Sequence, residues 1–230
     1  MSQAIDTSRA LVFNDLRTRR RVPMSTGLGA SLSVGLNQLG AALILLLISP
    51  IMALVAWLIW KRDGAPIFFG HYRVGRDGEL FRCLKFRSMY RDADRMLKEV
   101  LASDPQARAE WDRDQKLGND PRITPVGHFL RKTSLDELPQ LFNVLRGEMS
   151  LVGPRPITTG ELTRYGAARW HYLSVQPGMT GLWQVSGRNN TTYDERVALD
   201  RRYVEARSFR LDLSILFRTI KVVVARDGAR

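Results

Sequence analysis

The sequence is poor in the residues that support disulfide and zinc chemistry. Among its 230 residues Cys83 is the single cysteine, and histidine occurs only as His71, His128 and His171. One cysteine excludes an intrachain disulfide, which suits a reducing compartment, and the histidines lack the spacing of a zinc site. We expect each histidine to be structural. The sequence also lacks a glycine-rich loop of the Walker type.

Charged residues are absent from the long stretch between Val22 and Trp60. Its second half, 39–60, reads LGAALILLLISPIMALVAWLIW. These 22 residues would form a helix of about 33 Å, which matches the thickness of a bilayer. The run starts too late and is too long for a cleaved signal peptide. The sequence therefore predicts a membrane segment.

Two features complicate a plain transmembrane helix. Pro50 lies in its middle and removes a backbone donor, and the hydroxyl of Ser49 is placed to bond a carbonyl that the proline frees. Both flanks are basic, with Arg17, Arg19, Arg20 and Arg21 before the segment and Lys61, Arg62, Arg73 and Arg76 after it. A re-entrant hairpin that breaks at Ser49-Pro50 keeps both flanks on the cytoplasmic side, whereas a kinked spanning helix keeps only one there. The charge pattern favours the hairpin and leaves the single span as the alternative.

The chain is strongly basic, with a formal net charge of +12, and 29 of its 35 cationic residues are arginine. Such a balance indicates an anionic partner: nucleic acid, acidic lipid or a phosphorylated substrate. The aromatic residues near the arginine clusters form no regular stacking platform, so we expect no nucleic-acid partner. A non-enzymatic, membrane-anchored basic module that binds anionic lipid or nucleic acid is the alternative to an enzyme.

Hydrophobic and turn patterns predict a small α/β domain that is mostly helical and has interfacial amphipathic helices. Glycines punctuate β-prone runs between residues 64 and 86, which indicates an extended or hairpin region, and residues 91–117 read as helix interrupted near Pro105. The predicted organisation is a basic arm over 1–30, the membrane segment over 31–61 and a catalytic domain over 62–230.

Adjacent carboxylates mark the most informative stretch, Arg131 to Pro156. Leucine and phenylalanine spacing predicts an amphipathic helix over 136–146, with Pro139 in its first turn and a stop at Gly147. Asp136 and Glu137 would then lie at its positive end. The structural alternative is a capping box of Ser134 and Glu137, with Asp136 only complementing the helix dipole. Cations surround this pair in the sequence: Lys85, Arg87, Arg131, Arg155 and Arg188.

This combination suits a reaction between phosphorylated species, because an anionic nucleophile that attacks phosphorus needs neutralising charge. A hard cation that binds both carboxylate and phosphate oxygens would be Mg²⁺.

The chain resembles the bacterial monotopic phosphoglycosyl transferases, also called polyprenyl-phosphate hexose-1-phosphate transferases. The resemblance rests on Ser49-Pro50, on KFRSM at 85–89, on DPRITPVGHFLRKTSLDELPQLFNVLRGEMSLVGPRP at 120–156 and on PGMTGLWQVSGR at 177–188. These motifs are long and ordered, and the resemblance covers nearly everything from about residue 37 onward.

The resemblance implies transfer of a sugar-1-phosphate from a UDP-sugar to undecaprenyl phosphate, with UMP as the other product. Asp136 would be the nucleophile that forms an aspartyl phosphosugar, and Glu137 would be its partner carboxylate in holding Mg²⁺. Lys85, Arg87, Arg131, Arg155 and Arg188 would bind the substrate phosphates, and Asp194 and Asp200 match further acidic positions of less defined role.

The resemblance also implies a re-entrant helix that breaks at Ser49-Pro50, on the cytoplasmic face of the bacterial inner membrane, in the first membrane step of glycan assembly. The chain would be a minimal catalytic form. Whether it forms a homo-oligomer is a question that the sequence leaves open. One departure concerns the start of the membrane helix, where Asn37 stands near an acidic position of the family and no cation lies nearby.

Overall fold

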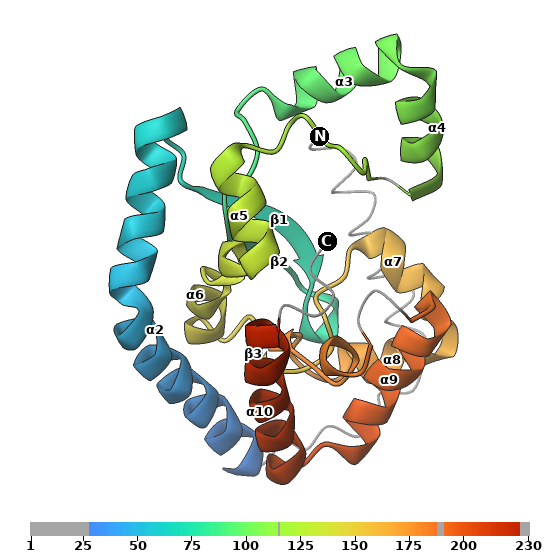
Figure 1. The fold of residues 1–230 in the computed structure, drawn as a ribbon. Helices are drawn as coiled ribbons and strands as arrows, with labels where there is room; N and C mark the ends of the chain where they lie inside the picture. Colours follow the sequence, from blue (N-terminus) through green and yellow to red (C-terminus); the bar gives the residue numbers. More distant parts are fainter. Residues whose placement is uncertain (1–27, 115, 188–190, 226–230) are drawn as a thin grey trace. The chain divides into compact units, whose positions relative to one another are not determined.

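The computed structural model describes residues 28–114, 116–187 and 191–225 (Figure 1). The chain divides into two compact units. The first unit contains 28–49, Gly70–Leu84 and the described residues from Pro139 onward. The second contains Pro50–Phe69 and Lys85–Leu138. Residues 1–27 of the predicted basic arm and the predicted phosphate ligand Arg188 lie outside the described residues.

Helix α2 (Leu28–Asp63) covers the predicted membrane segment and contains Pro50. Proline has no N–H to donate to the carbonyl four residues earlier, which here belongs to Leu46. The Ser49 hydroxyl donates to that Leu46 carbonyl at 2.9 Å, as the sequence predicted. The boundary between the two units falls between Ser49 and Pro50. The hairpin at this point stays a prediction.

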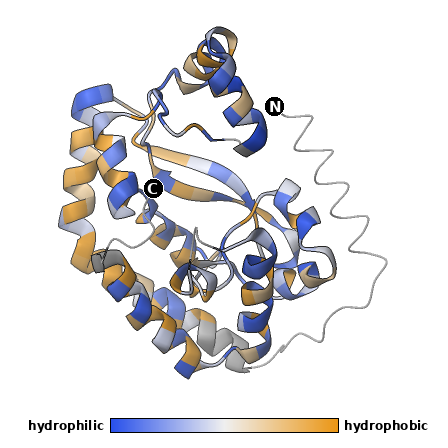
Figure 2. Ribbon diagram, turned by 45° about the vertical axis from the view of Figure 1, so that its right-hand side comes forward, coloured by the Kyte–Doolittle hydropathy of each residue, from blue (hydrophilic) through white to orange (hydrophobic). Residues whose placement is uncertain are grey.

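The apolar side chains of α2 are largely exposed. Figure 2 shows that hydrophobic residues predominate along this helix. By length and composition the part from Val34 to Asp63 is a candidate membrane span. Only 17% of the apolar 18-residue stretch that defines this span is buried. The core helix of a soluble protein would be mostly buried, so this low value supports a membrane segment.

Polar side chains attach the first half of α2 to its own unit. Asn37 Oδ1 accepts a hydrogen bond of 2.8 Å from the backbone N–H of Leu151, and Gln38 Nε2 donates to the Leu145 carbonyl at 3.0 Å. Asn37 is the residue that departs from the family pattern. Its amide oxygen accepts a hydrogen bond from a backbone N–H, and this interaction does not need a charged side chain at position 37.

The predicted extended region forms a two-stranded sheet of β1 (Phe68–Val74) and β2 (Leu80–Phe86), joined through the short 3₁₀ turn η1 (Arg76–Gly78). In the second unit, β2 leads through residues 87–92 to helices α3 (Ala93–Ser103) and α4 (Pro105–Asp114). The predicted break at Pro105 is confirmed. Proline fits there because a first-turn N–H needs no helical partner.

Helix α5 (Pro125–Thr133) follows in the second unit and begins with Thr124, whose hydroxyl accepts from the Gly127 N–H at 2.9 Å. Gly127 is required because a Cβ there would overlap the backbone carbonyl of Ser88. The helix ends at Ser134, which adopts the left-handed conformation with φ 57° and ψ 15°. The chain then enters the 3₁₀ turn η2 (Leu135–Glu137).

The predicted helix over 136–146 is shorter in the structure. Helix α6 is Gln140–Leu145, with Pro139 as its N-terminal cap residue, and the acidic pair precedes it in η2. Ser134 makes no capping hydrogen bond, so the predicted capping alternative is wrong. Gly147 follows the helix with φ 75°, which confirms the predicted stop.

The first unit contains a second small sheet, in which β3 (Ser150–Val152) pairs in parallel with β4 (Gly178–Thr180). Its apolar core includes Ala41 of α2 and a group of buried residues from β2, α6 and their neighbours: Phe81, Cys83, Leu141, Val144 and Met149. Gly178 lies in β4, where a Cβ would overlap the backbone of Gly153.

The rest of the first unit is helical. Its elements are α7 (Thr159–Arg164), η3 (Gly166–Ala168), α8 (Arg169–Leu173), η4 (Trp183–Val185), α9 (Tyr193–Ala206) and α10 (Phe209–Ala225). Helix α10 packs Ile215 into the core, while Phe209, Leu213, Phe217 and Ile220 are exposed. This exposed apolar face is compatible with the predicted interfacial helix, whose contact with lipid stays a prediction.

Candidate active site

The acidic pair lies in η2, directly after the left-handed residue that ends α5. Asp136 is buried, with 7% of its surface exposed, whereas Glu137 is half-buried. A non-glycine residue with positive φ is uncommon, and here it forms the left-handed C-cap of α5. Here Ser134 turns the chain so sharply that the two carboxylates follow α5 within four residues.

Lys85, near the end of β2, lies beside both carboxylates. Its Nζ donates a hydrogen bond of 2.7 Å to Glu137 Oε1 and lies 3.6 Å from Asp136 Oδ2. All three residues belong to the second unit. The structure thus brings together three residues that the sequence assigned to one site from motifs some 50 residues apart.

The environment of Asp136 makes its carboxyl group more basic than usual. Burial raises its pKa, and the negative charge of Glu137 adds to the rise, while Lys85 and Arg131 oppose it. A buried carboxylate is poorly solvated, and a raised pKa makes it a stronger base. Asp136 is therefore a candidate nucleophile or base.

Arg131 reaches the same region from the last turn of α5. Its Nε donates to the Ser88 hydroxyl at 2.9 Å, and its pKa is lowered mainly by burial, although Asp136 and Asp120 raise it. Ser88 follows Lys85 and Arg87 in the chain and was not predicted as a site residue. Its position inside the KFRSM motif was the available signal.

Near Arg131 lies an ion pair, Asp120 and Arg122, which the sequence analysis did not identify as part of the site. Asp120 and Arg122 are both buried and make two side-chain hydrogen bonds of 2.7 and 2.8 Å. Burial alone would raise the pKa of Asp120, but the hydrogen bonds and charge of Arg122 outweigh it and lower the pKa. The Arg122 guanidinium also lies 5.1 Å from the centre of the Trp111 ring. This pair fixes the segment that leads into α5.

Arg87 has a different setting from the other predicted phosphate ligands of the second unit. Its Nη2 donates to the backbone carbonyls of Asp63 at 3.1 Å and Gly64 at 2.7 Å, and lies 2.9 Å from Asp63 Oδ2. It therefore binds the C-terminal end of α2, where unpaired helix carbonyls favour a cation. Its role in binding substrate stays a prediction.

The first unit has its own cluster of cations and aromatic rings. The guanidiniums of Arg155 and Arg196 lie 5.8 Å and 4.8 Å from the centre of the Trp183 ring. Glu161 lies 3.5 Å from Arg196 and 3.6 Å from Arg73. Guanidiniums held beside an aromatic ring are suited to phosphate recognition. Arg155, predicted from the GPRP motif, thus lies among arginines that the sequence did not identify.

The two predicted acidic positions of α9 have contrasting surroundings. Asp194 is exposed in the first turn of the helix. Asp200 is 1% exposed and accepts a hydrogen bond of 2.7 Å from the Tyr165 hydroxyl, and burial raises its pKa to about 6. Nearby Arg196 and Arg155 oppose that rise. Asp200 therefore belongs to the arginine cluster of the first unit, and Asp194 does not share its environment.

The donor set of Asp136 and Glu137 fits part of a magnesium site. No group of three or more His, Cys, Asp or Glu residues with metal-binding geometry occurs among the residues that the structure describes. Mg²⁺ is commonly held by one or two carboxylates together with water and substrate phosphates, so two adjacent carboxylates are sufficient from the protein. The ammonium of Lys85 would have to yield part of its contact with Glu137.

Several curated proteins are similar to this chain over most of its length. An undecaprenyl-phosphate galactose phosphotransferase from Salmonella typhimurium is 60% identical over 81% of this chain and 39% of its own length. A UDP-galactose-lipid carrier transferase from Erwinia amylovora is 58% identical over 84% of this chain and 40% of its own length. The chain thus spans about two fifths of these relatives.

A third relative is similar over nearly its whole length. The exopolysaccharide production protein ExoY from Sinorhizobium fredii is 48% identical over 90% of this chain and 94% of its own length. The family model of bacterial sugar transferases matches residues 31–226, which include most of α2, the acidic pair and the arginine cluster of the first unit. With this match over most of its length, the chain belongs to the bacterial sugar transferase family.

Proposed function

We propose that the protein is a phosphoglycosyl transferase that moves a sugar-1-phosphate from a UDP-sugar to undecaprenyl phosphate. The products are a polyprenyl diphosphosugar and UMP. The names of the Salmonella and Erwinia relatives support the acceptor and the transferred group. The observation that carries the proposal is the buried, basic carboxylate of Asp136 beside Lys85 in a chain with an exposed apolar helix.

The chemistry consists of two displacements at one phosphorus atom. In the first, an Asp136 oxygen attacks the phosphorus that carries the sugar; the bond from this phosphorus to the bridging oxygen breaks, and UMP leaves with that electron pair. In the second, an oxygen of the acceptor phosphate attacks the same phosphorus and releases the Asp136 carboxylate. No net proton or electron is consumed in the transfer between the phosphates.

The neighbouring charges give each residue a role in this scheme. The side chain of Lys85 lies 2.7 Å from Glu137 and 3.6 Å from Asp136, so it can neutralise charge that develops as the phosphate approaches. Arg131 adds a second cation, held by Ser88. Mg²⁺, if held by Asp136 and Glu137, would neutralise further phosphate charge.

The two-step scheme requires a nucleophile that is ionised yet reactive. Burial raises the pKa of Asp136 and thereby increases its basicity, while Lys85 and Arg131 oppose that rise and favour the carboxylate form. Removal of either cation would favour the protonated, unreactive form.

We place the reaction at the cytoplasmic face of the bacterial inner membrane, as the first membrane step of exopolysaccharide, capsule or O-antigen assembly. The exposed apolar surface of α2 supports attachment to the membrane. UDP-sugars are water-soluble and polyprenyl phosphates are not, so an enzyme that joins them needs a site near the lipid boundary.

A UMP-release assay tests this function. Purified protein in detergent is incubated with Mg²⁺, undecaprenyl phosphate and a panel of UDP-sugars that begins with UDP-galactose, because galactose occurs in the names of the two most similar relatives cited above. We expect acceptor-dependent UMP release that Asp136→Asn abolishes and that the exposed control Asp94→Asn preserves. Absence of turnover with all of the UDP-sugars would contradict the proposal. Turnover that Asp136→Asn leaves unchanged would contradict it as well.

A further inference from the structure

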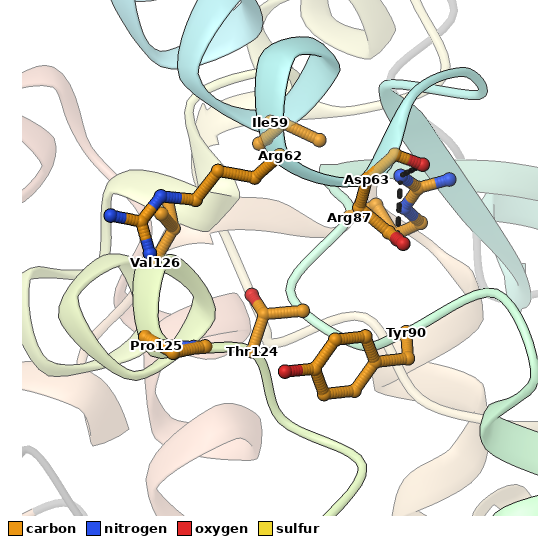
Figure 3. A pocket seen from close by; sticks show the side chains of 8 residues that line it. All are labelled: Ile59, Arg62, Asp63, Arg87, Tyr90, Thr124, Pro125 and Val126. Atoms are coloured by element: carbon orange, nitrogen blue, oxygen red, sulfur yellow. Dashed lines mark hydrogen bonds and ion pairs between the residues drawn. The ribbon is translucent and has the colours of Figure 1, made fainter.

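Arg155 differs in its contacts from the other described cations that the sequence predicted to bind phosphate. Lys85 donates to Glu137 at 2.7 Å, and Arg87 lies 2.9 Å from Asp63 beside a cavity at the end of α2 (Figure 3). Arg155 is half-buried, and no residue that the structure describes accepts a hydrogen bond from its guanidinium or forms an ion pair with it. Its N–H donors are therefore available for an anion.

Backbone contacts bring the GPRP motif beside the motif that contains Trp183. The Gly153 N–H donates to the Thr180 carbonyl at 2.8 Å. A Cβ at Gly181 would overlap the backbone carbonyl of Gly153, so the two segments approach more closely than a side chain allows. Arg155 and Trp183 each follow this junction by two residues, and their side chains start from neighbouring backbone segments.

Trp183 is itself held in place. It is 9% exposed, and its Nε1 donates to the Thr191 hydroxyl at 2.6 Å. The guanidiniums of Arg155 and Arg196 lie 5.8 Å and 4.8 Å from the centre of its ring. Glu161 lies 3.5 Å from Arg196, so that second guanidinium already has a carboxylate partner. The ring thus contacts one paired and one unpaired arginine.

A ring contact holds an arginine without consuming its hydrogen-bond donors. A guanidinium within about 6 Å of a tryptophan ring is attracted by the ring electrons and needs no acceptor atom. Without such support, a long arginine side chain loses its rotamer freedom only when the anion binds, which costs affinity. A guanidinium that is oriented in advance retains a planar set of donors that matches the oxygens of a phosphate.

The charges around Arg155 also favour an anion. Glu161 lies 3.6 Å from Arg73 and 3.5 Å from Arg196, so its carboxylate partners these two arginines. The positive charge of Arg155 opposes the rise in the pKa of buried Asp200, but no ion pair joins the two side chains. Three arginines thus share two carboxylates, which leaves an excess of positive charge for a ligand.

We infer that Trp183 is a positioning residue, whose ring holds the Arg155 guanidinium with its donors free for the diphosphate of the UDP-sugar. The inference rests on the proposed function, which supplies the diphosphate. Trp183 acts through Arg155 and is not itself a ligand of the substrate. The motif at 177–188 contains Trp183, but the sequence assigned it no role.

Binding of UDP to the full-length protein in detergent with Mg²⁺ tests this role by isothermal titration calorimetry. UDP carries the diphosphate but no sugar to transfer, so the titration measures affinity without turnover. Trp183→Leu removes the cation–π contact and should weaken UDP binding about fivefold. Trp183→Phe keeps a ring beside Arg155 and should recover most of that loss. If Trp183→Leu fails to fold, Trp183→Met replaces it, because a flexible methionine fills irregular space better.

A double-mutant cycle with Arg155→Gln separates positioning from a general effect on the fold. Arg155→Gln alone should weaken UDP binding about tenfold, because a charge-assisted phosphate contact is lost. In its presence, Trp183→Leu should have almost no further effect, since the group that the ring positions is absent. The matched control is Trp170→Leu in α8, which removes a ring that lies 5.0 Å from the Arg169 guanidinium and should leave UDP affinity unchanged.

Additive effects of Trp183→Leu and Arg155→Gln would overturn the inference, because the tryptophan would then act independently of Arg155. Unchanged UDP affinity in Trp183→Leu, or a loss that Trp183→Phe does not recover, would overturn it as well. A protein that binds UDP with these dependences but never releases UMP would contradict the proposed function alone. A protein that binds no UDP would contradict both.

Discussion

Lys85 donates its short hydrogen bond, 2.7 Å long, to Glu137. The same Nζ lies 3.6 Å from Asp136, which is the more buried of the two carboxylates. Adjacent acidic residues thereby acquire different environments: Glu137 is held by a direct charge-assisted hydrogen bond, and burial makes Asp136 the more basic group. Pairs of titratable groups that differ in this way commonly divide catalytic roles between them.

Replacement of Lys85 by methionine should make Asp136 harder to ionise. Lys85 is the strongest opponent of the burial that raises the pKa of Asp136, so its loss raises that pKa further. Because the carboxylate is the reactive form, the acid limb of the profile of kcat/KM against pH should move to higher pH. Loss of charge stabilisation should also lower kcat about 10²-fold.

The control for this variant is Lys132→Met, which removes an exposed lysine from α5. It should leave both the acid limb and kcat within twofold of the original. An unchanged acid limb in Lys85→Met would show that Asp136 ionisation does not limit the reaction.

Ser88→Ala should reduce turnover without changing the charge of the site. Arg131 Nε would lose its acceptor at 2.9 Å, and one such hydrogen bond is worth about 1 kcal/mol, or roughly a fivefold loss in kcat. Steady-state UMP release measures the effect. A second measurement, thermal unfolding, distinguishes positioning from folding: a loss of turnover that merely parallels a lower Tm would argue against a positioning role.

Gly127→Ala should destabilise the second unit. The new Cβ would overlap the carbonyl oxygen of Ser88, which is backbone and cannot rotate away, so α5 has to shift. Overpacking of this kind costs about 1–3 kcal/mol. Gly160→Ala in α7 is a matched control, since its Cβ would meet only Thr158 Oγ1 at 4.0 Å. Chemical unfolding of both variants should show a loss for Gly127→Ala alone.

Asp200 should make stability fall with rising pH. Burial raises its pKa to about 6 from 3.8, so the folded protein retains a proton that the unfolded chain loses between about pH 4 and 6. The free energy of unfolding should therefore decrease across this window, by roughly 3 kcal/mol at most, and contribute no further change above it. Asp200→Asn should remove this component from thermal unfolding curves recorded at several pH values.

The exposed Asp194 on the same helix provides the comparison. Asp194→Asn should retain the full pH dependence of the original protein. If Asp200→Asn kept the same slope between pH 4 and 6, the carboxyl group would be ionised in the folded protein, through its neighbours Arg196 and Arg155.

Local signals in the sequence predicted much of the fold. The uncharged run before Trp60, the glycines around β1 and β2, and Pro105 correspond to α2, the two-stranded sheet and the boundary between α3 and α4. These features depend on residues close together in the chain. Gly147 was also identified correctly, because a positive φ after a helix is a local requirement.

The details of the site depended on contacts that a linear pattern does not contain. Leu138, Leu141 and Leu145 have helical spacing, but the left-handed Ser134 and the cap residue Pro139 divide the segment into η2 and α6. The motifs identified Lys85, Arg131 and Asp136, while Ser88 emerged only from its hydrogen bond to Arg131. Likewise, Arg155 lies 5.8 Å from the Trp183 ring of η4, and Arg196 of α9 lies beside the same ring.

Detection of a covalent phosphosugar on Asp136 is the most direct test of the mechanism. The protein is incubated with a UDP-sugar and Mg²⁺ without acceptor, then quenched, digested and analysed by mass spectrometry. The account predicts one equivalent of UMP and a hexose-phosphate adduct on the peptide that contains Asp136, discharged when polyprenyl phosphate is added. Lipid-linked product that forms at full rate while this peptide never carries the adduct would contradict it.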